Sequence, residues 1–303
     1  MLGESGRWLC AAAVALAVSM AGTGSVAADS GPEGKALVVL GDSFSANAWD
    51  FMDPDNSCLR HGTTAWPVQL GKLMGVNGTD EMVDVSCPGA SIDSGPGWTV
   101  GMQAAKADKA GAFGPRTELV TMQFGMNDRW GGSRQTLWTS LRDCVFNFVD
   151  GCGPESVGQG RIPDYNAVSG ALFADRVRNA VTYIRYYAPN ARIVLVGYPE
   201  LFTPGSDVLC LDFFGVAPLI QPRGRAVVEY LDRVDQAQRE AARLLNVDFL
   251  DARALTIGHG LCSNEPWLNG VFDPRADIAG LYFHPSSRGD AVVATAMYDR
   301  YGN

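Results

Sequence analysis

A short apolar run at residues 36–40 ends abruptly in Gly41-Asp42-Ser43. The run is too short for a helix and rich in valine, so it predicts a strand buried on both faces, as in a parallel sheet. In open α/β sheets, ligands bind outside the carboxyl ends of the strands, where helix N-termini offer free N–H groups to negative charge. Ser43 is therefore a candidate nucleophile, although Gly-Asp-Ser alone is more often a turn and helix cap.

The first 28 residues have the pattern of a secretory signal peptide. Arg7 precedes an apolar stretch at residues 8–20, and small residues follow as far as Ala28. The apolar stretch is too short to span a membrane, so we expect cleavage near Ala28 and an exported protein. A retained N-terminal anchor is the alternative, which the missing charged stop-transfer flank disfavours.

Residues 29–303 contain no second long apolar segment, no repeat and no low-complexity tract. They fit a single α/β domain that can bury a sizeable core. The chain has 33 acidic and 24 basic residues and a net charge of −9, which argues against nucleic acid as a partner. The composition favours a soluble extracellular enzyme, which we expect to be a monomer without stable membrane insertion.

Cysteine usage agrees with export. Cys10 lies in the predicted signal peptide, and the mature chain keeps six cysteines. An even number in a secreted protein indicates disulfides. A zinc site is the rival interpretation, but there is no C-x-x-C pair, so we expect no metal.

The positions of these six cysteines narrow the possible pairings. The first follows the first strand closely and the second ends the second strand, so both should lie at one edge of the sheet. The third and fourth flank a short loop, whose closure would stabilise by about 2.5 kcal/mol. The last two are then left for each other. The predicted pairs are Cys58–Cys87, Cys144–Cys152 and Cys210–Cys262.

Apolar runs and amphipathic segments alternate along the chain. Further strands are expected at residues 81–86, 118–124, 191–196 and 247–250. Helices are expected at 62–74, within 93–115, at 133–149, 169–187, 222–245 and 286–301, with a surface excursion at 151–166. Strands alternating with helices imply a three-layer α/β/α sandwich around a five-stranded parallel sheet.

Three more segments fall where such a sheet would bring distant residues together. Gly89 follows the second predicted strand, Gly125-Met126-Asn127-Asp128 follows the third, and His284 precedes the closing helix. Together with Gly41-Asp42-Ser43, these blocks stand in the order of the SGNH hydrolases, the GDSL-type esterases and lipases. The chain resembles that family over almost all of its mature length. The resemblance implies the family's flavodoxin-like fold.

By this resemblance, Ser43 is the nucleophile and His284 the general base. The oxyanion hole consists of the Ser43 N–H, the Gly89 N–H and the Asn127 side-chain amide. The chemistry agrees, because a serine needs an adjacent base and the histidine pKa suits that task near neutrality. One oxyanion donor is typically worth about 3 kcal/mol of transition-state stabilisation. His61 and His259 compete for the role of base, and His61 is the stronger rival.

The chain departs from the family pattern beside its histidine. Most members carry an aspartate three residues earlier, where this chain has Leu281; Asp277 and Asp273 lie further upstream. The finer resemblance is to larger secreted actinobacterial members, which have three disulfides and a Gly-His-Gly-x-Cys segment. Some of these use a Ser-His dyad, in which a main-chain carbonyl accepts the imidazole Nδ1–H. We therefore predict a dyad with the Leu281 carbonyl as orienting acceptor.

The leading hypothesis is a secreted esterase or lipase that hydrolyses carboxylic esters through an acyl-enzyme on Ser43, without a cofactor. A phospholipase, or an acyltransferase with the same residues, is the alternative, and a non-catalytic glycan- or lipid-binding relic is a third hypothesis. The substrate is expected to be a small-molecule or lipid ester. Acyl chain length and the alcohol group stay open.

Overall fold

The computed structural model of this chain describes residues 33–49, 58–94 and 98–302. The expected signal peptide, its cleavage site and Cys10 lie outside the described residues. No helix in these three ranges is long and apolar enough to cross a membrane.

The predicted parallel sheet is present, with five strands in the order β2-β1-β3-β4-β7. All of its neighbouring strands run parallel, and both β1 and β3 are buried throughout, which explains their mostly apolar sequences. The strands are β1 (Leu37–Gly41), β2 (Met82–Asp84), β3 (Leu119–Gln123), β4 (Arg192–Val196) and β7 (Asp248–Leu250).

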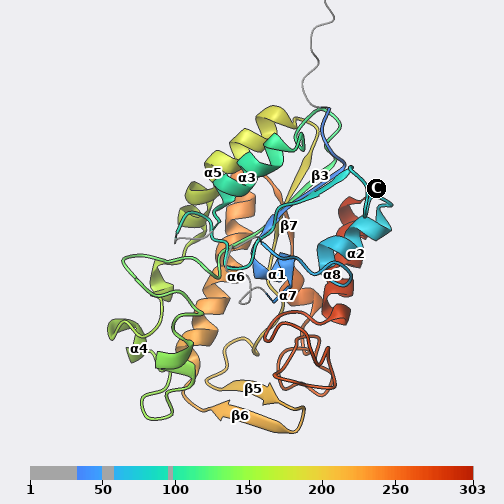
Figure 1. Cartoon of the computed structure of the whole chain (residues 1–303). Helices are drawn as coiled ribbons and strands as arrows, with labels where there is room; N and C mark the ends of the chain where they lie inside the picture. The colour runs from blue at the N-terminus through green and yellow to red at the C-terminus, as the bar shows by residue number, and fades with distance from the viewer. Residues whose placement is uncertain (1–32, 50–57, 95–97, 303) are drawn as a thin grey trace, which may run out of the picture. The chain divides into compact units, whose positions relative to one another are not determined.

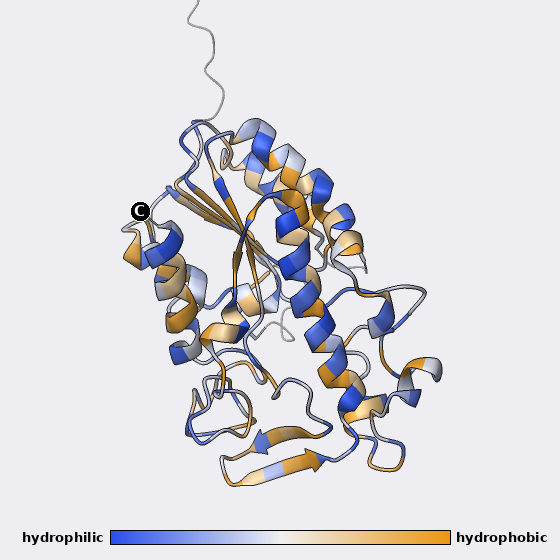
Figure 2. Ribbon diagram, turned by 180° about the vertical axis from the view of Figure 1, so that it is seen from behind, coloured by the Kyte–Doolittle hydropathy of each residue, from blue (hydrophilic) through white to orange (hydrophobic). Residues whose placement is uncertain are grey.

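Helices cover both faces of this sheet, as predicted (Figures 1 and 2). Alternate residues of β1 point to opposite layers. Val38 and Leu40 belong to the core beneath the first group of helices, whereas Leu37 and Val39 pack in the core with Trp66. The first group is α3 (Val100–Lys109), α5 (Gly170–Tyr187) and α6 (Arg225–Leu245); the second is α2 (Trp66–Leu73) and α8 (Ser287–Tyr301).

The segment 133–149, predicted as a helix, is mostly irregular. Only Leu141–Val145 is helical, as a short π-helix. Thr136 and Thr139 show the reason, because their hydroxyls accept hydrogen bonds from each other's backbone N–H groups. Such local bonds offer the backbone an alternative to the helix ladder. The Cys144–Cys152 disulfide further ties the segment to the excursion that follows.

Several short elements were not predicted. The most important is an antiparallel hairpin, β5 (Leu209–Phe213) and β6 (Ala217–Gln221), which forms a second, two-stranded sheet. Figure 1 shows it beyond the carboxyl ends of the parallel strands, on the same side as α1. The other short helices are α1 (Ser43–Ala46), α4 (Glu155–Gly158) and α7 (Ala252–Leu255), with a 3₁₀ turn at Tyr165–Ala167.

Three disulfides are present, and they join the pairs expected from the sequence. One joins the chain beyond α1 to the loop after β2, and one joins the segment 133–149 to the excursion that follows it. The third joins β5 to the loop after α7. The pairs are Cys58–Cys87, Cys144–Cys152 and Cys210–Cys262. Each closes a loop that would otherwise add conformational freedom to the unfolded chain.

Candidate active site

Ser43 stands where β1 meets α1. Asp42 is the N-cap of this helix, and its carboxylate accepts the Phe44 N–H at 2.9 Å. Because Ser43 is the first helical residue, its own N–H has no intrahelical acceptor. Its hydroxyl oxygen lies 2.8 Å from Nε2 of His284, although 241 positions separate the two residues. The fold therefore brings the predicted nucleophile and base into hydrogen-bond contact.

The other ring nitrogen of His284 faces a main-chain carbonyl, but not the predicted one. Nδ1 lies 2.9 Å from the Tyr282 oxygen, so the prediction of Leu281 was wrong. The Leu281 carbonyl instead accepts the His284 backbone N–H at 3.2 Å, which closes a tight turn. Phe283, inside this turn, has a left-handed φ of 64°. The turn leaves the Tyr282 carbonyl beside the ring.

The imidazole of His284 is almost fully enclosed, with 6% of the residue exposed. The ring of Phe44 stacks on it at a centroid distance of 4.3 Å, and that of Trp138 at 5.6 Å. Burial lowers the pKa of His284 to about 4, so the ring is neutral at pH 7. With Nδ1–H donated to the Tyr282 carbonyl, the lone pair of Nε2 faces the serine hydroxyl. That tautomer is the one a general base requires.

Neither upstream aspartate contacts the imidazole. Asp277 accepts the Oγ–H of Ser287 at 2.9 Å and its N–H, at the start of α8. Asp273 forms an ion pair with Arg275 at 2.8 Å. Among the described residues, no carboxylate is hydrogen-bonded to His284. The geometry is that of a serine-histidine pair oriented by backbone.

The two rival histidines have other partners. Nδ1 of His61 accepts the Thr64 N–H at 3.2 Å, and this side chain is exposed. His259 stacks on Trp267 at 3.5 Å, and its Nδ1 lies 2.8 Å from the Glu265 carbonyl. Neither ring is hydrogen-bonded to Ser43.

Gly89 and Asn127 lie on neighbouring loops beyond β2 and β3. The Asn127 amide donates to the Ala90 carbonyl at 2.9 Å, which ties the two loops together. One N–H of an amide group satisfies that bond, so the second remains for a ligand. Gly89 has a φ of 75°, a backbone conformation that side chains with a Cβ rarely adopt. Both groups can therefore present donors at the carboxyl edge of the sheet.

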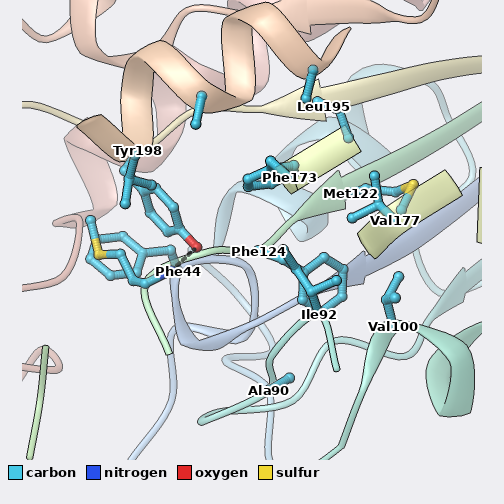
Figure 3. Packing of buried hydrophobic residues seen from close by; sticks show 14 of the residues in the cluster. Phe44, Ala90, Ile92, Val100, Met122, Phe124, Phe173, Val177, Leu195 and Tyr198 are labelled. Atoms are coloured by element: carbon cyan, nitrogen blue, oxygen red, sulfur yellow. Dashed lines mark hydrogen bonds between the residues drawn. The ribbon is translucent and has the colours of Figure 1, made fainter. Parts of the chain in front are cut away.

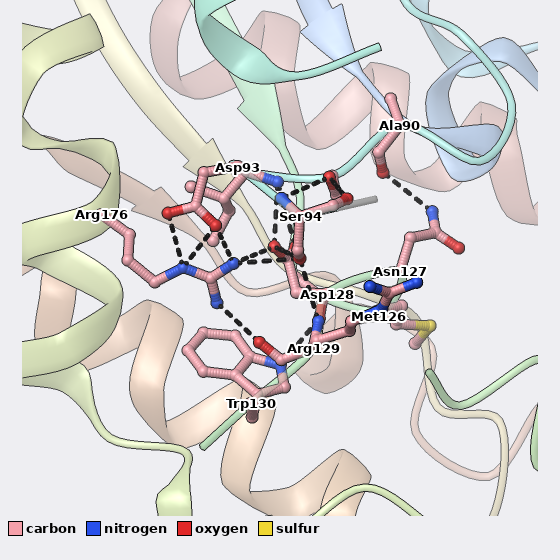
Figure 4. A network of polar contacts seen from close by, with 12 residues as sticks. Ala90, Asp93, Ser94, Met126, Asn127, Asp128, Arg129, Trp130 and Arg176 are labelled. Atoms are coloured by element: carbon pink, nitrogen blue, oxygen red, sulfur yellow. Dashed lines mark hydrogen bonds and ion pairs between the residues drawn. The ribbon is translucent and has the colours of Figure 1, made fainter. Parts of the chain in front are cut away.

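A buried ionic network holds these loops in position (Figure 4). Asp128 is fully buried, accepts the Ile92 N–H at 3.1 Å and the Ser94 hydroxyl at 3.0 Å, and pairs with Arg176 of α5. Burial raises the pKa of Asp128, and the charge of Arg176 opposes that rise. Arg176 also pairs with Asp93. The sequence did not reveal Arg176, because one arginine on an amphipathic helix resembles a solvated surface residue.

Tyr198, just beyond β4, was missed for a similar reason. Its hydroxyl donates to Asp42 at 2.6 Å and accepts the Met126 N–H at 3.2 Å. Figure 3 shows it beside Phe44, and the two rings meet edge to face at 4.9 Å. Burial raises the pKa of Asp42 to about 7, and the bond from Tyr198 opposes the rise. One hydroxyl thus links the segments beyond β1, β3 and β4.

A hollow of about 360 Å³ flanks the histidine loop. Leu281 and Pro285 line one part of it, and Asn47 and His61 line another. His61 thus faces this hollow rather than the serine. Neither Ser43 nor His284 is among the residues that line this hollow.

Comparisons with known proteins found related sequences and related structures. The family model described as GDSL-like Lipase/Acylhydrolase matches residues 39–292. Lipase 2 of Streptomyces coelicolor is 24% identical over 277 residues, which cover 88% of this chain and 85% of the relative. A lipase of Streptomyces rimosus is 25% identical, with 95% of each chain covered.

Two solved structures share the fold. The crystal structure of phospholipase A1 from Streptomyces albidoflavus NA297 matches with a TM-score of 0.57 and 18% identity, over 88% of this chain and 99% of the other. The extracellular lipase from Streptomyces rimosus matches with a TM-score of 0.57 and 21% identity, over the same shares.

Proposed function

This chain belongs to the GDSL-like lipase/acylhydrolase family, and we propose that it hydrolyses carboxylic esters through an acyl-enzyme on Ser43. The observation that carries the proposal is the 2.8 Å contact between the serine oxygen and Nε2 of a neutral, buried His284. A serine hydroxyl is a weak nucleophile until a base accepts its proton.

The first half of the reaction transfers the acyl group. Ser43 Oγ attacks the ester carbonyl while its proton passes to Nε2 of His284. The carbonyl oxygen becomes an oxyanion, which the Ser43 and Gly89 N–H groups and the Asn127 amide stabilise. When the tetrahedral intermediate collapses, the imidazolium protonates the alkoxide that leaves as the alcohol.

The second half restores the enzyme. His284 takes a proton from water, and the hydroxide attacks the acyl carbonyl in the same oxyanion hole. The carboxylic acid then leaves, and the proton returns from Nε2 to Ser43 Oγ. The Tyr282 carbonyl keeps the required tautomer throughout, although a neutral acceptor stabilises the imidazolium less than a carboxylate would.

We propose lipid acyl esters as the substrate class and the extracellular space as the site of action. The lipase names of the Streptomyces relatives support the first proposal, and one structural neighbour is a phospholipase A1. The predicted signal peptide and the three disulfides support the second, because disulfides persist in oxidising compartments. Acyl transfer to an alcohol would use the same residues.

The test is a chain-length series of nitrophenyl esters, with phosphatidylcholine and an acetylated glycan assayed in parallel. We expect turnover of the nitrophenyl esters and release of fatty acid from the phospholipid, both abolished in Ser43→Ala. Adding alcohols to the assay and counting acylated products separates transfer from hydrolysis. Turnover that persists in folded Ser43→Ala would refute the proposed nucleophile.

A further inference from the structure

The β5–β6 hairpin exposes an unusually apolar strip. Residues 213–220, Phe-Phe-Gly-Val-Ala-Pro-Leu-Ile, carry no charge. Val216 is 84% exposed and Phe214 57% exposed, and Ile220 also faces solvent. Figure 2 shows much of the hairpin in the hydrophobic colour. Single exposed apolar residues are ordinary, but a contiguous exposed run marks an interaction surface.

This strip continues toward the catalytic pair through stacked aromatic rings. Phe214 stacks on Phe272, 47% exposed, at a centroid distance of 6.0 Å. Phe272 meets Tyr282 edge to face at 5.4 Å. Tyr282 is the residue whose carbonyl orients His284. We call residues 213–220 together with Phe272 the hairpin ridge. Its last residue, Phe272, contacts Tyr282, and Tyr282 contacts His284.

Backbone conformation adds a second observation. Phe214 has a φ of 60° and Phe272 a φ of 54°, both in the left-handed region. A bulky side chain is rare there because its Cβ crowds the following carbonyl. Such strain persists mainly where function requires it. Here both left-handed residues carry aromatic rings that stack on each other and are about half exposed.

The charges near the ridge argue against an anionic partner. Arg275 is the nearest cation to Phe272 along the chain, and it is paired with both Asp212 and Asp273. The whole chain carries a net charge of −9, which repels an anionic membrane. An uncharged, partly aromatic surface suits the boundary between headgroups and acyl chains.

The edge of the hairpin is unsuited to pairing with a strand from a second copy of the chain. β6 is an edge strand, and exposed edges pair readily with other strands. Pro218 lies within β6 and lacks an N–H, which weakens such pairing.

We propose that the hairpin ridge docks the enzyme onto the surface of zwitterionic lipid aggregates, so that ester chains enter beside Ser43 and His284. The proposal rests on the proposed function, because it assumes that the site acts on lipid esters. Its direct observable is binding, which does not require turnover.

The experiment measures how much protein sediments with sucrose-loaded phosphatidylcholine vesicles. All proteins carry Ser43→Ala, so that the vesicles stay intact. Phe214→Gly should reduce partitioning about fivefold, and the pair Phe214→Gly with Val216→Ser about twentyfold, because each exposed apolar group adds to the buried area. Phe214→Gly should also raise the melting temperature, since glycine relieves the left-handed strain. A weaker binder that folds better cannot be explained by unfolding.

Tyr186→Ala is the matched control, because Tyr186 is 77% exposed on α5, remote in sequence from the ridge. It should partition like the parent. The proposal would be overturned if the ridge variants bound the vesicles as well as the parent does, or if Tyr186→Ala lost as much binding as they do. Tighter binding to phosphatidylglycerol than to phosphatidylcholine vesicles would also overturn it. So would a lipid-free dimer that the ridge variants convert to monomer, which would make a second copy the occupant. If the wild-type enzyme, which keeps Ser43, does not turn over soluble esters although the vesicle binding is as expected, the proposed function alone is refuted.

Discussion

The carboxyl edge of the parallel sheet and the hairpin beyond it differ in what they bury. The sheet edge buries polar groups, whereas the hairpin exposes apolar side chains. At the sheet edge, buried carboxyl groups such as those of Asp42 and Asp128 have protein partners from other loops. On the hairpin, apolar side chains such as Phe214 and Val216 face solvent. A buried polar group without a partner is costly, so the first region tolerates little change. Changes of the exposed side chains in the second region should cost little stability.

The largest expected effect separates the two regions outright. Ser43→Ala should lower kcat for a soluble nitrophenyl ester by more than about 10⁴-fold, because it removes the attacking atom. Phe214→Gly should leave the same assay within about twofold, because the ester is already dissolved and needs no surface contact. Steady-state kinetics on both variants, with circular dichroism as a fold control, measure the contrast. A comparable loss in both would erase the distinction between the regions.

Asn127→Ala should have the next largest effect. We expect kcat to fall about 10²- to 10³-fold with little change in KM, because the oxyanion develops mainly in the transition state. Asn190→Ala is the matched control, since its amide also donates to a carbonyl, that of Pro115 at 2.8 Å, but at an exposed position. The control should keep its kcat. A pure KM effect in Asn127→Ala would make this residue a ground-state contact.

The pH dependence of kcat/KM tests the burial of His284 at the sheet edge. His284 must be neutral to act as base, and burial lowers its pKa to about 4. The value of kcat/KM should therefore stay level down to about pH 5 and fall about tenfold per unit well below pH 4. Between an unfolded-state pKa of about 6.5 and the folded value, His284 binds more protons in the unfolded chain, so the contribution of this residue to stability falls as pH falls. An acid limb with its midpoint above pH 6 would contradict this burial.

Tyr198→Phe tests the links among the loops. Removing the hydroxyl leaves Asp42 and the Met126 N–H short of a partner in a buried place, which should cost about 1–3 kcal/mol of unfolding free energy. Tyr183→Phe removes a hydroxyl that donates to Asp108 at 2.8 Å nearer the surface, and should cost less than about 0.5 kcal/mol. Urea denaturation of the two variants gives the difference. Equal small losses would mean that Tyr198 is not a structural link.

The sequence could predict those parts of the site and the fold that have a local pattern. Ser43, Gly89, Asn127 and His284 each stand in a short motif at a strand end or before a helix, so the resemblance of these motifs to a known family could single them out as candidates. The central strands were predicted because buried parallel strands are mostly apolar runs, as in β1, whereas the two edge strands β2 and β7 are short and only partly buried.

What was missed depends on three-dimensional partners. Tyr198 and Arg176 carry no local motif, and only their contacts with Asp42 and Asp128 give them a role. The acceptor for His284 was misplaced by one residue, because the left-handed Phe283 turns the Tyr282 carbonyl toward the ring. The hairpin escaped notice because its apolar residues face solvent, which reverses the usual meaning of an apolar run.

The central claim is that Ser43 and His284 form a dyad oriented by a backbone carbonyl, without a carboxylate. The most direct measurement is the rate at which a fluorophosphonate labels Ser43, followed by intact-protein mass spectrometry, in wild type, Asp273→Asn and Asp277→Asn. The dyad predicts that each variant labels within about tenfold of wild type, against the loss of about 10⁴ when a triad aspartate is made asparagine. A loss of about a thousandfold or more in either folded variant would show a displaced triad and contradict the account.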